Sequence, residues 1–215
     1  MSTKTPLRRR AAIQLGGLQL LLVMVVLMWV VEAINKLDNQ QLDKDGAIYA
    51  RNVGRLWGIF TAPFLHFGFH HLESNTIPFV FMGVFIALEG ARRLGLVTII
   101  VIVIAGLGTW LIAPGNAETV GASGVVFGYA TYLFTRGVFN RNLLELLVGG
   151  IVGVVWGGAL LASIVPHYGI SWQDHASGAV GGILAAWLLS RDRTPAPASN
   201  HQAGTFAARR TPKGA

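Results

Sequence analysis

Uncharged runs and short charged or Pro/Gly-containing breaks alternate along this chain. Long apolar runs are typical of membrane-spanning helices, because about 20 residues are needed to cross the hydrocarbon core of a bilayer. The pattern therefore predicts an all-α fold, a polytopic bundle of six transmembrane helices. The expected bounds are Ala11 to Val31, His71 to Leu88, Leu94 to Ile112, Val120 to Thr135, Leu143 to Val165 and His175 to Ser190.

Polar segments separate and flank these helices. The stretch from Asn35 to Trp57 is rich in charged residues and is predicted to form a long first external loop. After Ser190, prolines stand among small and basic residues, a composition typical of disorder. We therefore expect a basic N-terminal segment (1–10), one membrane domain (11–190) and a disordered tail (191–215). The first apolar run exceeds the core of a signal peptide, which is about 7–15 residues long, and is interpreted as a transmembrane helix.

The positions of basic residues predict the orientation in the membrane. Loops rich in lysine and arginine face the cytoplasm. Arginines lie in the N-terminal segment and just after the second, fourth and sixth helices, whereas residues 114–119 and 166–172 contain no lysine or arginine. Both termini are therefore predicted to be cytoplasmic, in a membrane that we interpret as a bacterial plasma membrane.

The composition supports lipid as the solvent. The chain is 53% hydrophobic and 13% charged, whereas a soluble domain carries about 25% charged residues. It contains no cysteine, which excludes a disulfide framework and a thiolate metal site. The net charge of +7 could suggest nucleic acid, but the basic residues flank apolar runs. The expected partner is therefore the lipid bilayer, with no nucleic acid.

Polar residues cluster where the second, fourth and sixth helices begin. These clusters contain His71 and Asn75, then Ser123, then Asp174 and His175. With cytoplasmic termini, all three helices start at the outer face. At about 1.5 Å per residue, each cluster lies roughly 20–24 Å from the charged residue near the other end of its helix, and so some 5–10 Å below the outer surface. The fourth helix is expected to be too short to span the core alone, so its start must be shielded by protein or reached by water.

Serine and histidine at one depth suggest nucleophilic catalysis, because an imidazole can take the proton that a serine hydroxyl does not shed unaided. We expect Ser123 as nucleophile and His175 as base. Asp174 is adjacent to His175 and should point elsewhere on a helix, which predicts a dyad and not a triad. Glycines four residues apart would let the two helices approach closely. These are Gly124 and Gly128 on the fourth helix and Gly178 and Gly182 on the sixth.

The second helix offers hydrogen-bond donors at the same depth. His71 and Asn75 are four residues apart and share one helical face. Both can donate to a developing oxyanion, and the free backbone N–H of Ser123 at a helix start can join them.

These motifs, in this order, resemble those of the rhomboid proteases. Gly121-Ala122-Ser123-Gly124 resembles the Gly-x-Ser-Gly nucleophile motif of that family, and His71 to Asn75 resembles its His-x-x-x-Asn motif. The helix that begins at Asp174-His175 and continues through Gly178 and Gly182 resembles its Ala-His-x-x-Gly-x-x-x-Gly helix. Each motif alone is weak, but the ordered set is specific, and the resemblance covers roughly Leu56 to Ser190.

The resemblance implies an intramembrane serine endopeptidase that cleaves transmembrane segments of other membrane proteins near the outer face. It implies no metal and no cofactor. Trp57 matches the first residue of the Trp-Arg motif in the family's first loop, but Gly58 replaces the arginine, and Arg55 is a candidate to compensate. Phe127 stands where family members often have a tyrosine under the histidine, which keeps the packing and loses the hydroxyl. Asp174 replaces a small residue.

Alternatives remain for each feature. Ser123 alone could be a packing residue in a glycine-rich helix. His66 and His70 are four apart and could bind a metal, although hydrogen bonding within the first loop is the more ordinary role for His66. The whole chain could be a catalytically inactive relative that binds transmembrane helices, or a transporter with broken helices.

Overall fold

The computed structural model describes residues 6–115, 117–166 and 169–190, and it confirms the all-α class. The predicted tail, 191–215, and residues 1–5 lie outside the described residues. Long helices occur at all six predicted positions. They are α1 (Pro6–Leu37), α4 (Phe69–Ala87), α5 (Ala91–Ile112), α6 (Ser123–Asn140), α7 (Leu143–Ile164) and α8 (Trp172–Ser190).

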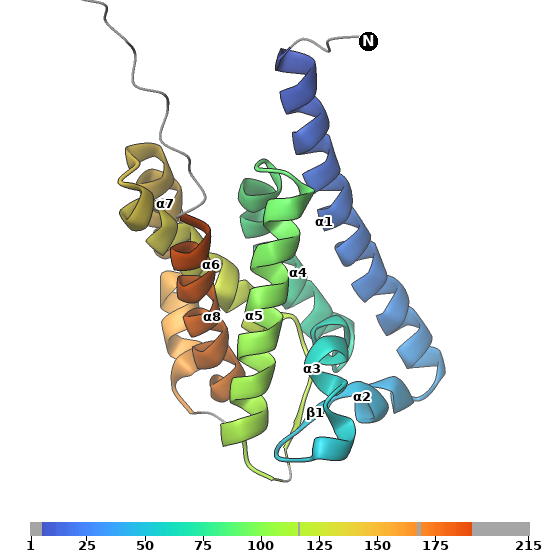
Figure 1. The fold of residues 1–215 in the computed structure, drawn as a ribbon. Helices are drawn as coiled ribbons and strands as arrows, with labels where there is room; N and C mark the ends of the chain where they lie inside the picture. The colour runs from blue at the N-terminus through green and yellow to red at the C-terminus, as the bar shows by residue number, and fades with distance from the viewer. Residues whose placement is uncertain (1–5, 116, 167–168, 191–215) are drawn as a thin grey trace, which may run out of the picture.

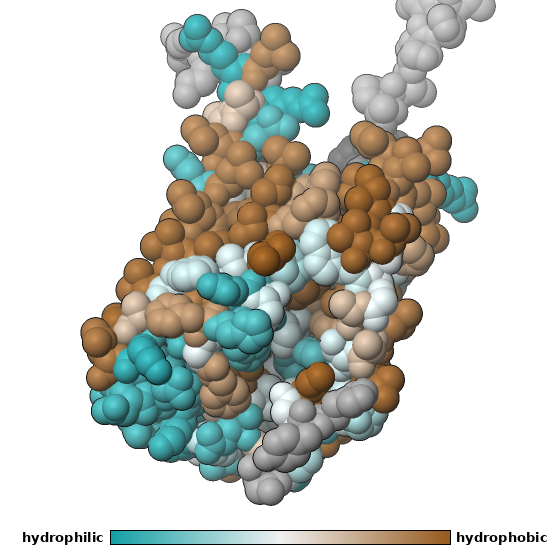
Figure 2. Space-filling view, turned by 180° about the vertical axis from the view of Figure 1, so that it is seen from behind, coloured by the Kyte–Doolittle hydropathy of each residue, from teal (hydrophilic) through white to brown (hydrophobic). Residues whose placement is uncertain are grey.

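Three of the described helices, α1, α5 and α7, are long and apolar enough to cross a membrane. Their surfaces agree with this, because Val154 on α7 is 88% exposed and many other large apolar side chains are open to the surroundings. In Figure 2 brown covers the upper part and the flanks of the face, and the largest teal area is at the lower left, at the end that holds α2 and β1 in Figure 1. The protein is therefore a membrane protein with a broad apolar surface.

Two helices extend further than the apolar pattern predicts. The helix α1 begins at Pro6, a residue suited to the first turn, and continues through Glu32 and Asn35 to Leu37. The helix α6 does not end before Arg136 but runs on to Asn140, where Arg141 in the left-handed conformation closes it. The expected end of this helix before Arg136 is therefore wrong, because the charge of Arg136 is buried among helix ends and does not terminate the helix. With 18 residues, α6 is not among the described helices that are long and apolar enough to cross a membrane.

The predicted first loop is folded into short elements. It contains α2 (Gln41–Gly46), β1 (Ile48–Tyr49), the 3-10 helices η1 (Val53–Arg55) and η2 (Ala62–Phe64), and α3 (Gly58–Thr61). The strand β1 pairs antiparallel with β2 (Glu118–Thr119), so the first loop is hydrogen-bonded to the segment just before α6. Figure 1 places these elements at the end of the bundle opposite the N-terminus.

The structure explains why glycine stands at position 58. A Cβ atom there would overlap the Ala47 carbonyl oxygen, so no side chain fits. Trp57 Nε1 donates to the Asp45 carbonyl at 3.2 Å. The Arg55 guanidinium donates to the Lys44 carbonyl at 2.8 Å and lies 4.7 Å from the centre of the Tyr49 ring. Arg55, three residues before Gly58, and Trp57 therefore both hold α2 through its backbone carbonyl groups.

Glycines allow a very close contact between α6 and α8. A Cβ atom on Gly178 would overlap the Gly124 carbonyl, and one on Gly182 would overlap the Gly128 carbonyl. The two backbones therefore touch without side chains between them. Thr131 donates to the Ala179 carbonyl at 2.8 Å across the same contact. The predicted glycine faces are confirmed as the contact surface.

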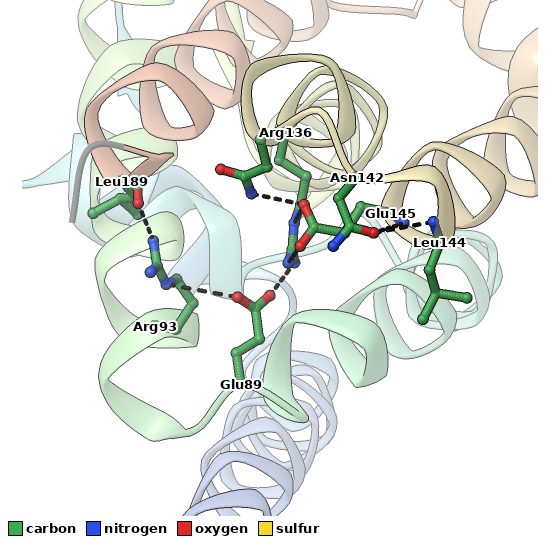
Figure 3. A network of polar contacts seen from close by, with 8 residues as sticks. Glu89, Arg93, Arg136, Asn142, Leu144, Glu145 and Leu189 are labelled. Carbon is green, nitrogen blue, oxygen red and sulfur yellow. Dashed lines mark hydrogen bonds and ion pairs between the residues drawn. The ribbon is translucent and has the colours of Figure 1, made fainter. Parts of the chain in front are cut away.

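An ion-pair network ties the helices together at the other end of the bundle (Figure 3). Arg136 on α6 pairs with Glu89, which follows α4, and with Glu145 on α7. Arg93 on α5 pairs with Glu89 and donates to the Leu189 carbonyl on α8 at 2.9 Å. Five helices thus meet through complementary charges and a helix C-terminus, which fixes their ends relative to one another.

The glycine contact predicts a position-specific loss of stability. We expect Gly182→Ala to lower the free energy of unfolding by about 2–3 kcal/mol, because the methyl group can be accommodated only if the backbones separate. Gly157→Ala on α7 is the matched control, since a Cβ atom there meets nothing within 4 Å, and it should leave stability unchanged or slightly raised. Thermal unfolding in detergent compares the two. Equal changes in the two variants would show that the close contact at Gly182 does not determine the effect.

Candidate active site

A cavity of about 910 Å³ opens among α4, α6, α7, α8 and the segment before α6. It is lined by four of the predicted site residues, His71, Asn75, Ser123 and His175, and by Phe127. The structure therefore brings together the polar groups that open three separate helices, as the depth argument predicted. Trp156 also lines the cavity and packs against Phe81, with 4.5 Å between ring centres.

Ser123 is the first residue of α6. The preceding turn depends on Gly121, whose φ of +124° is a conformation that side chains rarely adopt. His66 holds the same turn, because its Nε2 accepts a hydrogen bond from the Ala122 N–H at 3.3 Å. The Ser123 side chain is thus placed at the end of a helix where backbone N–H groups lack intrahelical partners.

His175 is oriented by two contacts. Its ring stacks on Phe127, with 4.2 Å between ring centres and 8° between planes, so the predicted packing is confirmed without a tyrosine hydroxyl. Its Nδ1 lies 2.9 Å from the Ser163 carbonyl oxygen on α7. Because a carbonyl only accepts, Nδ1 must carry the proton. The neutral ring therefore has its lone pair on Nε2, which is the form that a general base requires.

His71 and Asn75 lie against the turn before the nucleophile. The Phe67 N–H donates to His71 Nδ1 at 3.3 Å, so a neutral His71 carries its proton on Nε2. A Cβ atom built on Gly121 would lie 3.0 Å from that Nε2 and 3.6 Å from Asn75 Nδ2. Both donors are therefore close to the loop that delivers Ser123. Asn75 Nδ2 also donates to the His71 carbonyl at 3.2 Å.

Asp174 points in a different direction from His175, as its adjacent position on the helix predicts, and it does not line the cavity. Its carboxylate lies against the first turn of α6, in the space that a side chain on Gly124 would fill, and within reach of the Ser123 hydroxyl. Thr109 on α5 donates to it at 3.2 Å. The first turns of α6 and α8 sit side by side, so a residue adjacent to His175 still faces Ser123. Asp174 is a buried anion at the positive end of α6.

His66 and His70, the possible metal pair, have different environments, because His66 is buried and His70 is exposed. His66 is fully buried, and burial together with the neighbouring His71 lowers the pKa of His66 to about 3. Its Nε2 accepts a hydrogen bond from the Ala122 N–H. His66 therefore has the ordinary hydrogen-bonding role in the first loop that the sequence favoured. Among the described residues no group of three or more histidine, aspartate, glutamate or cysteine side chains could hold a metal ion.

Two functional neighbours could not be found from sequence motifs. The Ser163 carbonyl that orients His175 is a backbone atom, which no residue type signals. The contact of Asp174 with α6 depends on how closely the helices approach. The unusual carboxylate beside His175 was the available signal for that residue.

Comparisons with known proteins agree with the arrangement. Residues 53–192 match the family model described as the Rhomboid domain. The chain is 39% identical over 197 residues to an uncharacterised protein of Mycobacterium tuberculosis, covering 88% of this chain and 80% of that protein. It is 33% identical over 150 residues to Rhomboid-like protein 11, chloroplastic, of Arabidopsis thaliana, covering 61% and 51% of the two chains. It is also 31% identical over 137 residues to YdcA of Bacillus subtilis, which carries a provisional rhomboid protease name, covering 63% and 68%. The chain belongs to the rhomboid family of membrane proteins.

Proposed function

We propose that this protein is an intramembrane serine endopeptidase with a Ser123–His175 dyad. The observation that carries the proposal is the shared cavity, in which Ser123 lies with a histidine whose Nδ1 is tied to a backbone carbonyl. This arrangement leaves Nε2 of His175 as the base. Membership of the rhomboid family supports the same reaction class.

The proposed reaction has two stages. The Ser123 oxygen attacks the carbonyl carbon of the scissile peptide bond while its proton passes to His175 Nε2, and His175 then protonates the leaving amine. Water, activated by the same histidine, hydrolyses the acyl-enzyme and regenerates the hydroxyl. The negative oxygen that develops at the carbonyl is stabilised by the Ser123 N–H, His71 Nε2 and Asn75 Nδ2. No step needs a metal or cofactor.

The proposed substrates are transmembrane segments of other membrane proteins. All six long helices would cross a bacterial plasma membrane with both termini in the cytoplasm, which puts the cavity near the outer face. The apolar cavity wall, with Phe67, Trp156 and Leu160, suits an apolar segment.

An impermeant thiol reagent on intact cells tests the orientation, because a cysteine introduced at Ala117 should react and one at Arg141 should not.

A serine-directed fluorophosphonate tests the dyad directly. We expect covalent labelling of the wild type, no labelling of Ser123→Ala and strongly reduced labelling of His175→Ala, since an unassisted hydroxyl is a poor nucleophile. Ser171→Ala is the matched control, because Ser171 lines the same cavity, and it should label normally. Wild-type protein that binds transmembrane helices but neither labels nor cleaves would be an inactive family member.

The oxyanion role predicts a specific kinetic pattern. Asn75→Ala should lower kcat by about 10²–10³-fold and leave KM nearly unchanged, because its donor acts on the transition state. His71→Ala should behave in the same direction. Ser74→Ala serves as control, since Ser74 lines the cavity one position away. Single-turnover rates beside substrate affinities in liposomes give the comparison. A tenfold rise in KM with unchanged kcat would instead assign Asn75 to substrate docking.

Asp174 allows the dyad to be distinguished from a triad. Asp174→Asn keeps the shape and removes the charge at the start of α6. We expect a loss of about 1 kcal/mol in stability, as for other acidic groups at helix N-termini, and less than a tenfold change in kcat. Loss of a triad aspartate lowers kcat by about 10⁴-fold in serine proteases. A loss of that size in Asp174→Asn, with the fold intact, would make Asp174 a third catalytic member.

A further inference from the structure

A second group of buried polar side chains lies outside the candidate active site, where α1 meets the folded first loop. Glu32 and Asn35 occupy the last turns of α1, and Asp43 lies in α2. Their side chains are 0%, 0% and 1% exposed. The Asn35 amide is next to both carboxyl groups, and the carboxyl groups are close enough to repel each other. The three side chains form one sealed cluster, which we call the α1–α2 cluster.

The α1–α2 cluster is unusual because its polar atoms have few partners in the protein. All four carboxyl oxygens and both amide atoms of Asn35 are buried and make no hydrogen bond of acceptable geometry. The polar groups beside the carboxyl groups are the shared Asn35 amide and, for Glu32, the Gly68 backbone. Buried polar groups are normally paired, and an unpaired buried charge is far more costly than an unpaired amide. None of the ion pairs among the described residues involves Glu32 or Asp43. The nearby Lys36 is exposed.

The chemistry of the cluster indicates what it would bind. Two carboxylates and an amide oxygen are hard oxygen ligands, and their combined charge of −2 matches one divalent cation. Calcium takes 6–8 oxygen ligands in irregular geometry, and bidentate carboxylates with the amide oxygen supply five. Magnesium requires near-ideal octahedral geometry and keeps several waters, which a cluster sealed from solvent does not favour.

We propose that Glu32, Asn35 and Asp43 form a structural site for one calcium ion that fastens the first loop to α1. The site is separate from the Ser123 cavity, so it does not depend on the proposed peptidase activity. A cation there would join the end of α1 to α2. Through the β1–β2 pairing, the same loop is connected to the segment before Ser123.

Calcium-dependent unfolding of the full chain in detergent tests the site. After dialysis against EDTA, calcium at 100 times its dissociation constant should raise the Tm of the wild type by about 5–10 °C, and equal magnesium should raise it less. Glu32→Gln and Asp43→Asn should each remove the calcium shift. Asp45→Asn is the matched control, because Asp45 lies on the same short helix and is exposed, and it should retain the shift.

Equilibrium dialysis with radioactive calcium gives an independent readout that needs no folded variant. One saturable calcium per wild-type chain is expected, with binding lost in whichever of the two variants folds. Burial raises the pKa of Asp43, so a shared proton is the competing way to neutralise the cluster. Absence of saturable binding, with a wild-type Tm that ignores calcium and rises as pH falls from 8 to 5, would overturn the calcium site in favour of that proton.

Discussion

The close contact between α6 and α8 is the constraint on which the candidate site depends. At Gly178 and Gly182 the backbones meet without intervening side chains. This brings the first turns of both helices together, so that His175 can stack on Phe127 and share a cavity with Ser123. A larger residue at either glycine would separate the two helices. The geometry of the candidate site is therefore a consequence of packing in which dispersion and close backbone approach, not a hydrophobic driving force, hold the helices in lipid.

The two ends of the bundle are stabilised differently. At one end, Arg136 joins Glu89 and Glu145, and a partly buried ion-pair network fixes helix ends that carry opposite charges (Figure 3). At the other end, neutral groups hold the site: His66 receives the Ala122 N–H, and the Ser163 carbonyl receives His175 Nδ1. Placing the strong charge network far from the cavity leaves His175 without a competing carboxylate on Nδ1. Asp174 is the exception, and it lies against α6.

The first loop is held by Arg55 and Trp57, which both precede a required glycine. Gly58 is required because the Ala47 carbonyl occupies the space of its side chain. Arg55 then reaches the Lys44 carbonyl from an earlier position, and Trp57 holds the next residue, Asp45. Arg55 and Trp57 thus hold two consecutive residues of α2, while position 58 carries no side chain. Loop rigidity matters here because β1 pairs with β2, which leads directly into the nucleophile turn.

The sequence by itself determined the helices, the glycine faces and the residues that meet in the cavity. Apolar runs of membrane length have few alternatives to helix, since every backbone polar group in lipid must be paired internally. Ser123, His175, His71 and Asn75 could be grouped because each opens a helix at the same depth. Helix ends were less predictable, because Arg136 looked like a surface charge until its partners, Glu89 after α4 and Glu145 on α7, were known.

Only the tertiary structure decided the contacts that depend on approach distance or on backbone atoms. The position of Asp174 against the first turn of α6 follows from how closely α8 packs on α6. The tautomer of His175 follows from the Ser163 carbonyl on a distant helix. The sealed α1–α2 cluster arises because the first loop folds back over α1. The spacing of residues in the sequence predicts the direction in which a side chain points from its own helix. It does not predict the distance between two helices, on which these contacts depend.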